Sequence, residues 1–300
     1  MQETIDPDLA LFAHVAAAGG IAAAARRIGL SSPMVSRRLA RLEARLGVVL
    51  VRRTTRRLEL TAQGEDFYRE VRAILAAVEQ AEARLTGAAR LPAGPLKISA
   101  PTSFGRLHVA PRLKPFLDRH PKVAVTIELS DDYVDLLSER VDLAVRITAE
   151  LPSGVEATRL ATSRRVLCAA PDYIAARGAP ATIAELHGHS LLAAAGQLPW
   201  RLAREGRELV VNGESAVRTN SSEVVRELAV AGVGVALRSL WDVSRELAAG
   251  QLVRLLPEVE GSLDVGIYAV RPRAPFTPPA VEAFIGHLRE TLGPTPPWES

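Results

Sequence analysis

The sequence predicts a multidomain α/β protein, with a small helical domain at its N-terminus, one long helix after it, and a large α/β domain at its C-terminus. Three observations support this fold class. Arginines gather in residues 21–61 beside an apolar pattern of helical period, and an apolar heptad repeat follows at residues 67–85. From residue 96 to residue 270, strand-like runs alternate with helix-like stretches, as is typical of α/β domains.

The first 61 residues carry a concentrated positive charge. They hold ten arginines and five acidic residues, a formal charge of +5, whereas the whole chain has a formal charge of +3. The other 239 residues are therefore at −2. A basic module of this kind is expected of a protein that neutralises phosphates, although charge alone is equally compatible with a solvated arginine surface.

Two short helices are predicted at the start of this basic module. The first has apolar residues at helical spacing and ends at Gly19 and Gly20, where the chain can adopt a positive φ. The second covers residues 22–28 and ends at Gly29. The apolar positions of the first helix are Leu9, Phe12, Ala13 and Ala16.

A third helix follows, with Ser31 or Ser32 as its cap and Pro33 in its first turn, where a missing N–H costs nothing. Its apolar residues recur at steps of four, three and four and therefore face inward: Val35, Leu39, Leu42 and Leu46. By elimination, the outward residues are Ser32, Met34, Ser36, Arg37, Arg38 and Arg41, and Pro33 is a candidate DNA contact with them. Two helices around a tight glycine turn predict a helix-turn-helix, whose second helix enters the major groove of DNA.

A basic β-hairpin is predicted directly after Gly47, where two β-prone runs surround Arg52, Arg53, Arg56 and Arg57. Such a wing suits phosphates or the narrow minor groove. Arg37 or Arg38 can present a bidentate fork to guanine, and Ser36 can bind a base or a phosphate, whereas the wing arginines add affinity without reading the sequence.

The next predicted helix starts at a Thr61 cap and carries a heptad seam over about three repeats. At 1.5 Å per residue, about 25 residues span roughly 37 Å, which is longer than a small winged domain needs. A helix buried in a single chain remains an alternative, but pairing with a second chain explains the length better. The seam residues are Phe67, Val71, Ile74, Val78, Ala81 and Leu85.

The remaining part of the chain is predicted to be α/β. A segment with Pro92, Gly94 and Pro95 has the composition of a hinge. About 205 residues follow, enough for one core or for two small lobes. Strands are predicted at 96–100, 123–130, 141–147, 164–170, 208–213, 233–237 and 264–270.

The run AAAARRIGLSSPMVSRRLARLEARLGVVLVRRTTRRLELTAQGE resembles the winged helix-turn-helix of LysR-type transcriptional regulators, and a weaker resemblance covers nearly all 300 residues. The family usually enters its second helix with a Ser-Phe-Thr-like segment, but Gly20, Ile21 and Ala22 stand here instead. Loss of these hydroxyls predicts weaker capping, on the order of 1 kcal/mol, with no change of fold.

The resemblance implies a sequence-specific DNA-binding transcriptional regulator that acts as a dimer or tetramer on a dyad-symmetric promoter site. It also implies a two-lobed, periplasmic-binding-protein-like effector domain whose small-molecule effector modulates promoter binding, with crossover strands near 160–165 and 262–268. The implied boundaries are 1–61 for the winged helix-turn-helix, 62–89 for the linker and dimerisation helix, 90–94 for the hinge and 95–300 for the effector-binding domain, with lobe I at about 95–161 and 268–300 and lobe II at about 162–267.

Two hydroxyl-rich segments precede helix-like stretches and are predicted to bind an anionic effector: residues 101–104 and 219–222. For Ser103 and Ser222 the alternative is simple helix capping. The family's effector cleft lies between the lobes at matching positions. The predicted effector residues are Thr102, Ser103, Phe104, Asn220 and Ser221, together with Arg146, whose alternative is a structural ion pair, and Trp200, whose alternative is a core position.

The sequence favours no enzyme and no cofactor. Cys168 is the only cysteine and is expected to be a small buried residue. His187 and His189 lack further nearby metal ligands, and Gly232-Val-Gly234 follows a helix instead of opening one. An enzyme with a fused regulatory domain therefore has little support, and a transport solute-binding protein conflicts with the basic head.

The expected compartment is the bacterial cytoplasm, in contact with the nucleoid. Residues 1–20 contain three acidic residues and no Arg or Lys, so no signal peptide is predicted, and no apolar run is long enough to span a membrane. The expected partners are double-stranded DNA, a small-molecule effector, further copies of the chain, and RNA polymerase.

Overall fold

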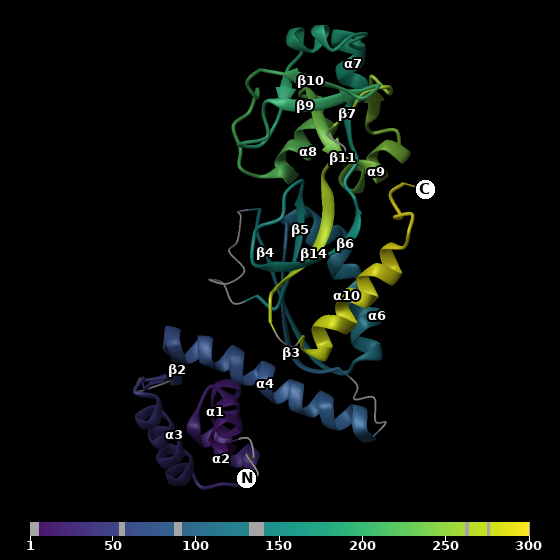
Figure 1. Cartoon of the computed structure of the whole chain (residues 1–300). Helices are drawn as coiled ribbons and strands as arrows, with labels where there is room; N and C mark the ends of the chain where they lie inside the picture. The colour runs from purple at the N-terminus through teal and green to yellow at the C-terminus, as the bar shows by residue number, and fades with distance from the viewer. Residues whose placement is uncertain are drawn as a thin grey trace. The chain divides into compact units, whose positions relative to one another are not determined.

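The computed structural model describes residues 6–53, 58–86, 92–131, 141–261, 264–274 and 277–299. The chain divides into two compact units. One contains residues 1–90 with 274–279, and the other contains residues 91–273 with 280–300. Figure 1 shows the helices and strands of both units.

The first unit begins with a helical head. The Asp6 carboxylate accepts a hydrogen bond of 2.8 Å from the backbone N–H of Asp8 and so caps the first helix, which ends at Gly19 with a φ of 62°. The second helix has no side-chain cap at Gly20, as its sequence predicts. The elements are α1 (Pro7–Ala18), α2 (Ile21–Ile28), α3 (Ser32–Leu46), β1 (Val51–Arg53), β2 (Leu58–Leu60) and α4 (Ala62–Thr86).

The core of the head confirms most of the inward stripe on α3. Val35, Leu39 and Leu42 are buried together with residues of α1 and α2. The prediction for Leu46 was wrong, since its side chain is 39 % exposed. The helix ends at Leu46, and Leu50, which is 2 % exposed, closes this side of the core instead.

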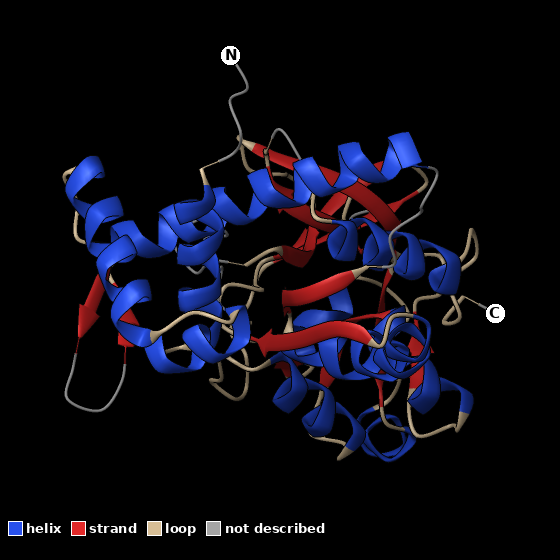
Figure 2. Cartoon of the chain, turned by 90° about the horizontal axis from the view of Figure 1, so that it is seen from below, coloured by secondary structure: helices blue, strands red, loops and turns tan. Residues whose placement is uncertain are grey.

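A two-stranded wing follows α3 and appears as a pair of red arrows in Figure 2. The Glu43 carboxylate of α3 fastens the wing, because its Oε1 accepts hydrogen bonds from the backbone N–H groups of Leu50 at 2.8 Å and Val51 at 3.0 Å. Thr61 caps α4 as predicted, since its Oγ1 accepts a 2.9 Å hydrogen bond from the N–H of Gly64.

Lobe I of the second unit contains a five-stranded sheet in the order β4-β3-β5-β14-β6. Strand β14 is antiparallel to both β5 and β6, whereas β3 is parallel to β4 and β5. Helices α6 and α10 pack together through Phe116 and Phe284, whose ring centroids are 4.8 Å apart (Figure 1). The elements are β3 (Ala93–Ala100), α5 (Thr102–Phe104), η1 (Gly105–Val109), α6 (Ala110–Arg119), β4 (Lys122–Leu129), β5 (Leu143–Thr148), β6 (Val155–Thr162), β14 (Gly266–Pro272) and α10 (Pro279–Leu292).

Lobe II contains two sheets, in the orders β12-β7-β11-β8 and β10-β9-β13. One apolar core includes Leu167, Trp200 and Leu237, and a second core includes Cys168, Val225 and Val243. The elements are β7 (Arg165–Ala169), α7 (Pro171–Arg177), η2 (Ala184–Gly188), β8 (Leu191–Leu192), β9 (Trp200–Arg204), β10 (Arg207–Val211), α8 (Ser222–Val230), β11 (Val235–Ser239), α9 (Leu240–Ala248), β12 (Val253–Leu255) and β13 (Glu260–Gly261).

Every strand predicted beyond residue 95 has a counterpart in these sheets, so the alternating pattern was a sound guide to the α/β class. The strands that were not predicted are very short or contain several polar residues. Strands β8 and β13 have only two residues each, and β6 contains Glu156, Thr158 and Arg159. Ala93 and Gly94 were expected in the hinge, but they are the first two residues of β3 and pair with Lys122 and Val123 of β4.

Candidate DNA-binding and effector sites

The outward side of α3 presents the side chains predicted to read DNA. Met34 is 42 % exposed, and Pro33 and Arg37 are exposed as well. Ser32 and Ser36 are half-buried. Ser31, one of the two predicted caps, occupies the cap position of α3. Its side chain makes no hydrogen bond to the helix.

Two of the predicted DNA-reading arginines are bound within the head. The Asp8 carboxylate, which is buried, accepts a hydrogen bond from Arg38 Nε at 2.5 Å and another from Arg41 Nη2 at 2.7 Å. Burial favours a higher pKa for Asp8, but the hydrogen bonds and charges of Arg41 and Arg38 outweigh it and hold the pKa below its usual value. Arg38 and Arg41 thus connect α3 to α1, whereas Arg37 faces outward.

The structure describes only some of the arginines that were predicted in the wing. Arg52 is exposed on β1, and Arg53 is the last residue of this strand. The side chain of Arg53 and the whole of Arg56 and Arg57 lie outside the described residues.

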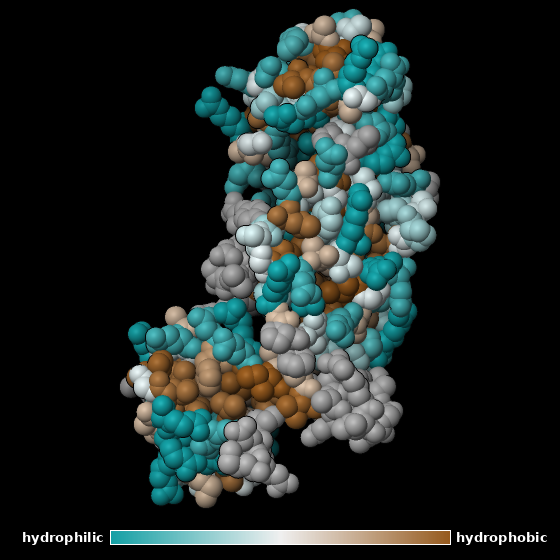
Figure 3. Space-filling view, viewed as in Figure 1, coloured by the Kyte–Doolittle hydropathy of each residue, from teal (hydrophilic) through white to brown (hydrophobic). Residues whose placement is uncertain are grey.

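Helix α4 divides its apolar residues between two surfaces. Val71 is 1 % exposed and belongs to the core of the head, and Phe67 packs on Phe12 with ring centroids 5.4 Å apart. These two seam residues therefore pack in the core of the head within one chain. Ile74 is 44 % exposed and Val78 is half-buried, and Figure 3 shows apolar side chains gathered along this helix. The side chains of Ala81 and Leu85 lie outside the described residues.

In the second unit, α5 of lobe I and α8 of lobe II lie in contact. The backbone N–H of Thr102 donates a 2.8 Å hydrogen bond to Asp131 Oδ1. Ser103 is buried, and its hydroxyl has no hydrogen-bond partner among the described residues. At the start of α8, Ser222 Oγ accepts a 2.8 Å hydrogen bond from the side-chain amide of Gln197.

The capping alternative does not account for these hydroxyls. Neither α5 nor α8 has a side-chain hydrogen bond at its cap position. Ser221 donates its backbone N–H to Thr219 Oγ1 at 3.0 Å, which orders the loop before α8. Asn220 is exposed. Gln197 was missed at the sequence level, because nothing in its neighbourhood marks it as lying near α8.

Two of the predicted effector residues are core residues. Trp200 is 1 % exposed in the core of lobe II, so the core alternative is correct for it. Phe104 is buried in lobe I, with its ring edge-to-face against Trp241 at 5.2 Å. Arg146 is buried on β5, where it pairs in register with Tyr268.

Contacts between the lobes come from residues that the sequence did not single out. Arg106 of η1 forms an ion pair of 2.7 Å with Glu223 of α8. Trp241 of α9 donates its indole N–H to Ser163 Oγ at 3.0 Å, and its carbonyl oxygen lies 2.7 Å from His108 Nε2. Burial lowers the pKa of His108 to about 4, so the ring is neutral at pH 7 and its Nε2–H can donate to this carbonyl.

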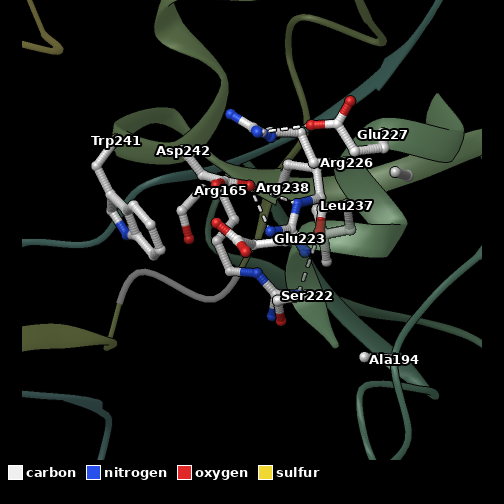
Figure 4. A network of polar contacts seen from close by, with 12 residues as sticks. Arg165, Ala194, Ser222, Glu223, Arg226, Glu227, Leu237, Arg238, Trp241 and Asp242 are labelled. Carbon is white, nitrogen blue, oxygen red and sulfur yellow. Dashed lines mark hydrogen bonds and ion pairs between the residues drawn. The ribbon is translucent and has the colours of Figure 1, made fainter. Parts of the chain in front are cut away.

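Arg165 places a positive charge near this junction. Figure 4 shows it close to Arg238, whose Nε donates a 2.8 Å hydrogen bond to Asp242. Burial and the charge of Arg238 lower the pKa of Arg165 to about 10. Its Nη2 donates to the carbonyl of Leu237 at 3.4 Å, and among the described residues no carboxylate forms an ion pair with it. A negatively charged ligand would offset this charge.

Cys168 and His189, two of the residues considered for enzyme or metal chemistry, are engaged within lobe II. Cys168 is fully buried, and burial raises the pKa of its thiol to about 12, so the thiolate is a negligible fraction at pH 7. His189 Nδ1 lies 3.1 Å from the hydroxyl of Tyr173. Within the described ranges, no group of three His, Cys, Asp or Glu residues has the spacing to hold a metal ion, and no helix is long and apolar enough to cross a bilayer.

Two family models match the chain. The model described as "Bacterial regulatory helix-turn-helix protein, lysR family" matches residues 7–65. The model described as "LysR substrate binding domain" matches residues 89–293. The first match lies within the first unit, and the second match covers most of the second unit.

The chain is also similar to regulators over most of its length. It is 38 % identical over 255 residues to the HTH-type transcriptional regulator DmlR of Escherichia coli (strain K12), which covers 84 % of this chain and 83 % of that protein. It is 36 % identical to the HTH-type transcriptional regulator PtxR of Pseudomonas aeruginosa, covering 95 % of this chain and 93 % of PtxR.

A solved structure shows the same architecture. CrgA, a LysR-type transcriptional regulator from Neisseria meningitidis, has a TM-score of 0.61 at 29 % identity, and the match covers 97 % of this chain and 100 % of that chain. The basic helix-turn-helix, the two-lobed α/β unit and these relatives lead to one conclusion: the chain belongs to the family of LysR-type transcriptional regulators, which bind DNA and carry an effector-binding domain.

Proposed function

We propose that this regulator binds a dyad-symmetric promoter site with α3 of each copy in the major groove. The observation that carries this proposal is the division of α3 into two sides. Val35, Leu39 and Leu42 are buried, while Met34 and Arg37 are exposed on the opposite side. The proposed domains are 1–61 for DNA binding, 62–89 for dimerisation, a hinge from residue 90 that ends where β3 begins at Ala93, and the remaining residues to 300 for the effector.

The side chains of α3 divide into direct contacts and supports. Arg37 is the proposed base reader, because its guanidinium is exposed and forms no ion pair with a described residue. Arg38 and Arg41 orient α3 through Asp8, and the remaining donors of Arg41, whose side chain is 70 % exposed, contact phosphate. Ser32, Ser36 and the wing arginine Arg52 are further proposed contacts.

Dimerisation is proposed to use the part of α4 that the head leaves uncovered. Ile74 is the exposed member of the seam, and Val78 continues it one heptad step later. A two-fold axis along α4 would place two recognition helices on half-sites about one helical turn apart or a multiple of it. Pairs of dimers give the tetramer.

The proposed effector site lies where α5 and α8 start, and the effector is proposed to be anionic. Ser103 offers a buried hydroxyl without a partner among the described residues, Thr102 precedes it in the chain, and Asn220 and Ser221 directly precede α8. Arg165 supplies a positive charge that no described carboxylate pairs with. An effector that engages both lobes would shift the balance between their arrangements and so change promoter binding.

The proposed setting is the cytoplasm, at the nucleoid, with RNA polymerase as the partner that senses promoter occupancy. Footprinting of the DNA upstream of the regulator's own gene, with and without candidate carboxylates, tests the proposal. We expect a dyad-symmetric protected site that weakens as salt rises and changes with one effector. Equal binding to every duplex, with no protected site, would contradict it.

A further inference from the structure

A large apolar side chain is exposed on the first turn of α3. Met34 is 42 % exposed, although it directly precedes the buried Val35 in the chain. Neighbouring positions of a helix point in different directions, so Met34 does not share the core that Val35 enters. Among the described residues of α3, the other exposed large apolar side chain is Leu46, at the opposite end of the helix. Met34 therefore lies at the end of α3 that is proposed to meet the edges of bases.

The arginines on the same side of α3 differ in what they bind. Arg38 and Arg41 follow Met34 by four and seven positions, and both donate to the Asp8 carboxylate of α1, at 2.5 Å and 2.7 Å. Arg37, three positions after Met34, is exposed and forms no ion pair with a described residue. The first turns of α3 thus present one guanidinium group that Asp8 does not bind and one thioether next to it.

The chemistry of methionine limits what Met34 can contribute to DNA recognition. A thioether has no hydrogen to donate to the O6 and N7 acceptors of guanine, and it has no charge to offer a phosphate. The major-groove edges of the base pairs carry one apolar group, the C5-methyl of thymine. A contact between Met34 and this methyl would remove apolar surface from water on both partners, and the flexible side chain of methionine can adapt to its position.

We propose that Met34 is a specificity-determining residue that contacts the C5-methyl group of one thymine in each half-site. This inference rests on the proposed entry of α3 into the major groove. It adds a preference for a T·A pair to the preference for guanine that is proposed for Arg37. The contact covers a side chain that is 42 % exposed in the chain without DNA.

The spacing of Met34 and Arg37 limits where this thymine lies. Side chains three positions apart on a helix have Cβ atoms about 5–6 Å apart. Successive base pairs are about 3.4 Å apart along the duplex. The thymine is therefore expected within about two base pairs of the guanine that Arg37 is proposed to read.

Removal of single methyl groups from the DNA tests the proposal with the full chain. A preferred duplex is selected from a random library, and each thymine of its half-sites is replaced in turn by deoxyuridine, which lacks only the C5-methyl. One thymine per half-site should be sensitive, with a loss of affinity of about threefold for one half-site and about tenfold for both. The Met34→Ala protein should bind the thymine and deoxyuridine duplexes alike, because its side chain is too short to reach the methyl.

The matched control is Leu46→Ala, which shortens the exposed apolar side chain at the other end of α3 and should keep the full sensitivity to deoxyuridine. Both positions are exposed, so circular dichroism should show the same folding for both variants. Absence of a methyl-sensitive thymine, or equal sensitivity with and without Met34→Ala, would overturn the role of Met34 and leave promoter recognition by α3 standing. Failure to select any preferred duplex would contradict the proposed promoter recognition, and the role of Met34 with it.

Discussion

The Asp8 carboxylate of α1 accepts a 2.5 Å hydrogen bond from Arg38 on α3, thirty residues further along the chain. Asp8 is buried, and Arg41 donates to its other oxygen. One acidic side chain in the first helix therefore sets the orientation of the helix that is proposed to enter the major groove. DNA recognition depends in this way on a residue outside the DNA-binding surface.

Asp8→Asn should destabilise the head by about 1–3 kcal/mol at pH 7, because it removes the charge from two hydrogen bonds to arginine. The pKa of Asp8 is lower in the folded chain, so its contribution is present above the usual pKa of about 3.9 and disappears as the pH falls through the lowered value. Hydrogen exchange of the amides of α1 and α3, measured at pH 7 and at pH 3, gives the destabilisation of the head at each pH.

The matched control is Asp66→Asn, which removes an exposed ion pair with Arg69 on α4. Its effect should stay within about 0.5 kcal/mol at both pH values. A loss for Asp8→Asn that is equally large at pH 3 would show that the charge of Asp8 is not the cause.

Arg37→Ala should lower affinity for the operator by about 1–3 kcal/mol and relax the base preference at one position. Arg52→Ala should weaken binding to operator and random DNA alike and reduce the slope of log affinity against log salt by about one. Electrophoretic mobility shifts over a salt series distinguish the two. Equal losses on operator and random DNA for Arg37→Ala would refute its role as a base reader.

Ile74→Glu should dissociate the dimer without unfolding the head, because this side chain is 44 % exposed within one chain. Val71→Glu, three residues earlier, should unfold the head, since it buries a charge in the core. Sedimentation velocity and circular dichroism report assembly and folding separately. An Ile74→Glu protein that remains fully dimeric would exclude this surface of α4 from the interface.

The junction of the lobes should lose stability in mild acid because of His108. Its pKa is about 4 in the folded chain and about 6.5 when unfolded, so the unfolded chain binds more protons between these values and stability falls as the pH drops from 6.5 to 4. The loss amounts to at most about 3 kcal/mol. His108→Gln should remove this part of the pH dependence in urea titrations, and an unchanged slope would contradict the assignment.

Sequence patterns predicted which side of a helix each side chain lies on better than they predicted which residues the side chain contacts. The spacing of Val35, Leu39 and Leu42 gave the buried side of α3, because helical period alone determines which residues share a side. The same elimination placed Arg38 and Arg41 on the outside, but Arg38 is half-buried, and elimination could not show that Asp8 binds both arginines. That contact depends on how α1 packs against α3.

The effector region shows the same division. The hydroxyl-rich segments were found from their position before helices, and the structure brings α5 and α8 into contact. The ion pair between Arg106 and Glu223 joins residues 117 positions apart, and no local pattern encodes it. The prediction of Trp200 as an effector residue was wrong, because the sequence around an isolated tryptophan does not distinguish a ligand contact from a core position. Its place in the core depends on the pairing of β9 with β10, which the sequence did not predict.

The order of strands in lobe I has a consequence for synthesis on the ribosome. Strand β14 starts at Gly266 and lies between β5 and β6, although β6 ends at Thr162. At about 5–20 residues per second, roughly 5 to 20 seconds separate the emergence of β6 from that of its partner. While lobe II is translated, the nascent chain therefore carries an unfinished sheet whose β5 and β6 edges stay unpaired with β14 until residues 266–272 emerge.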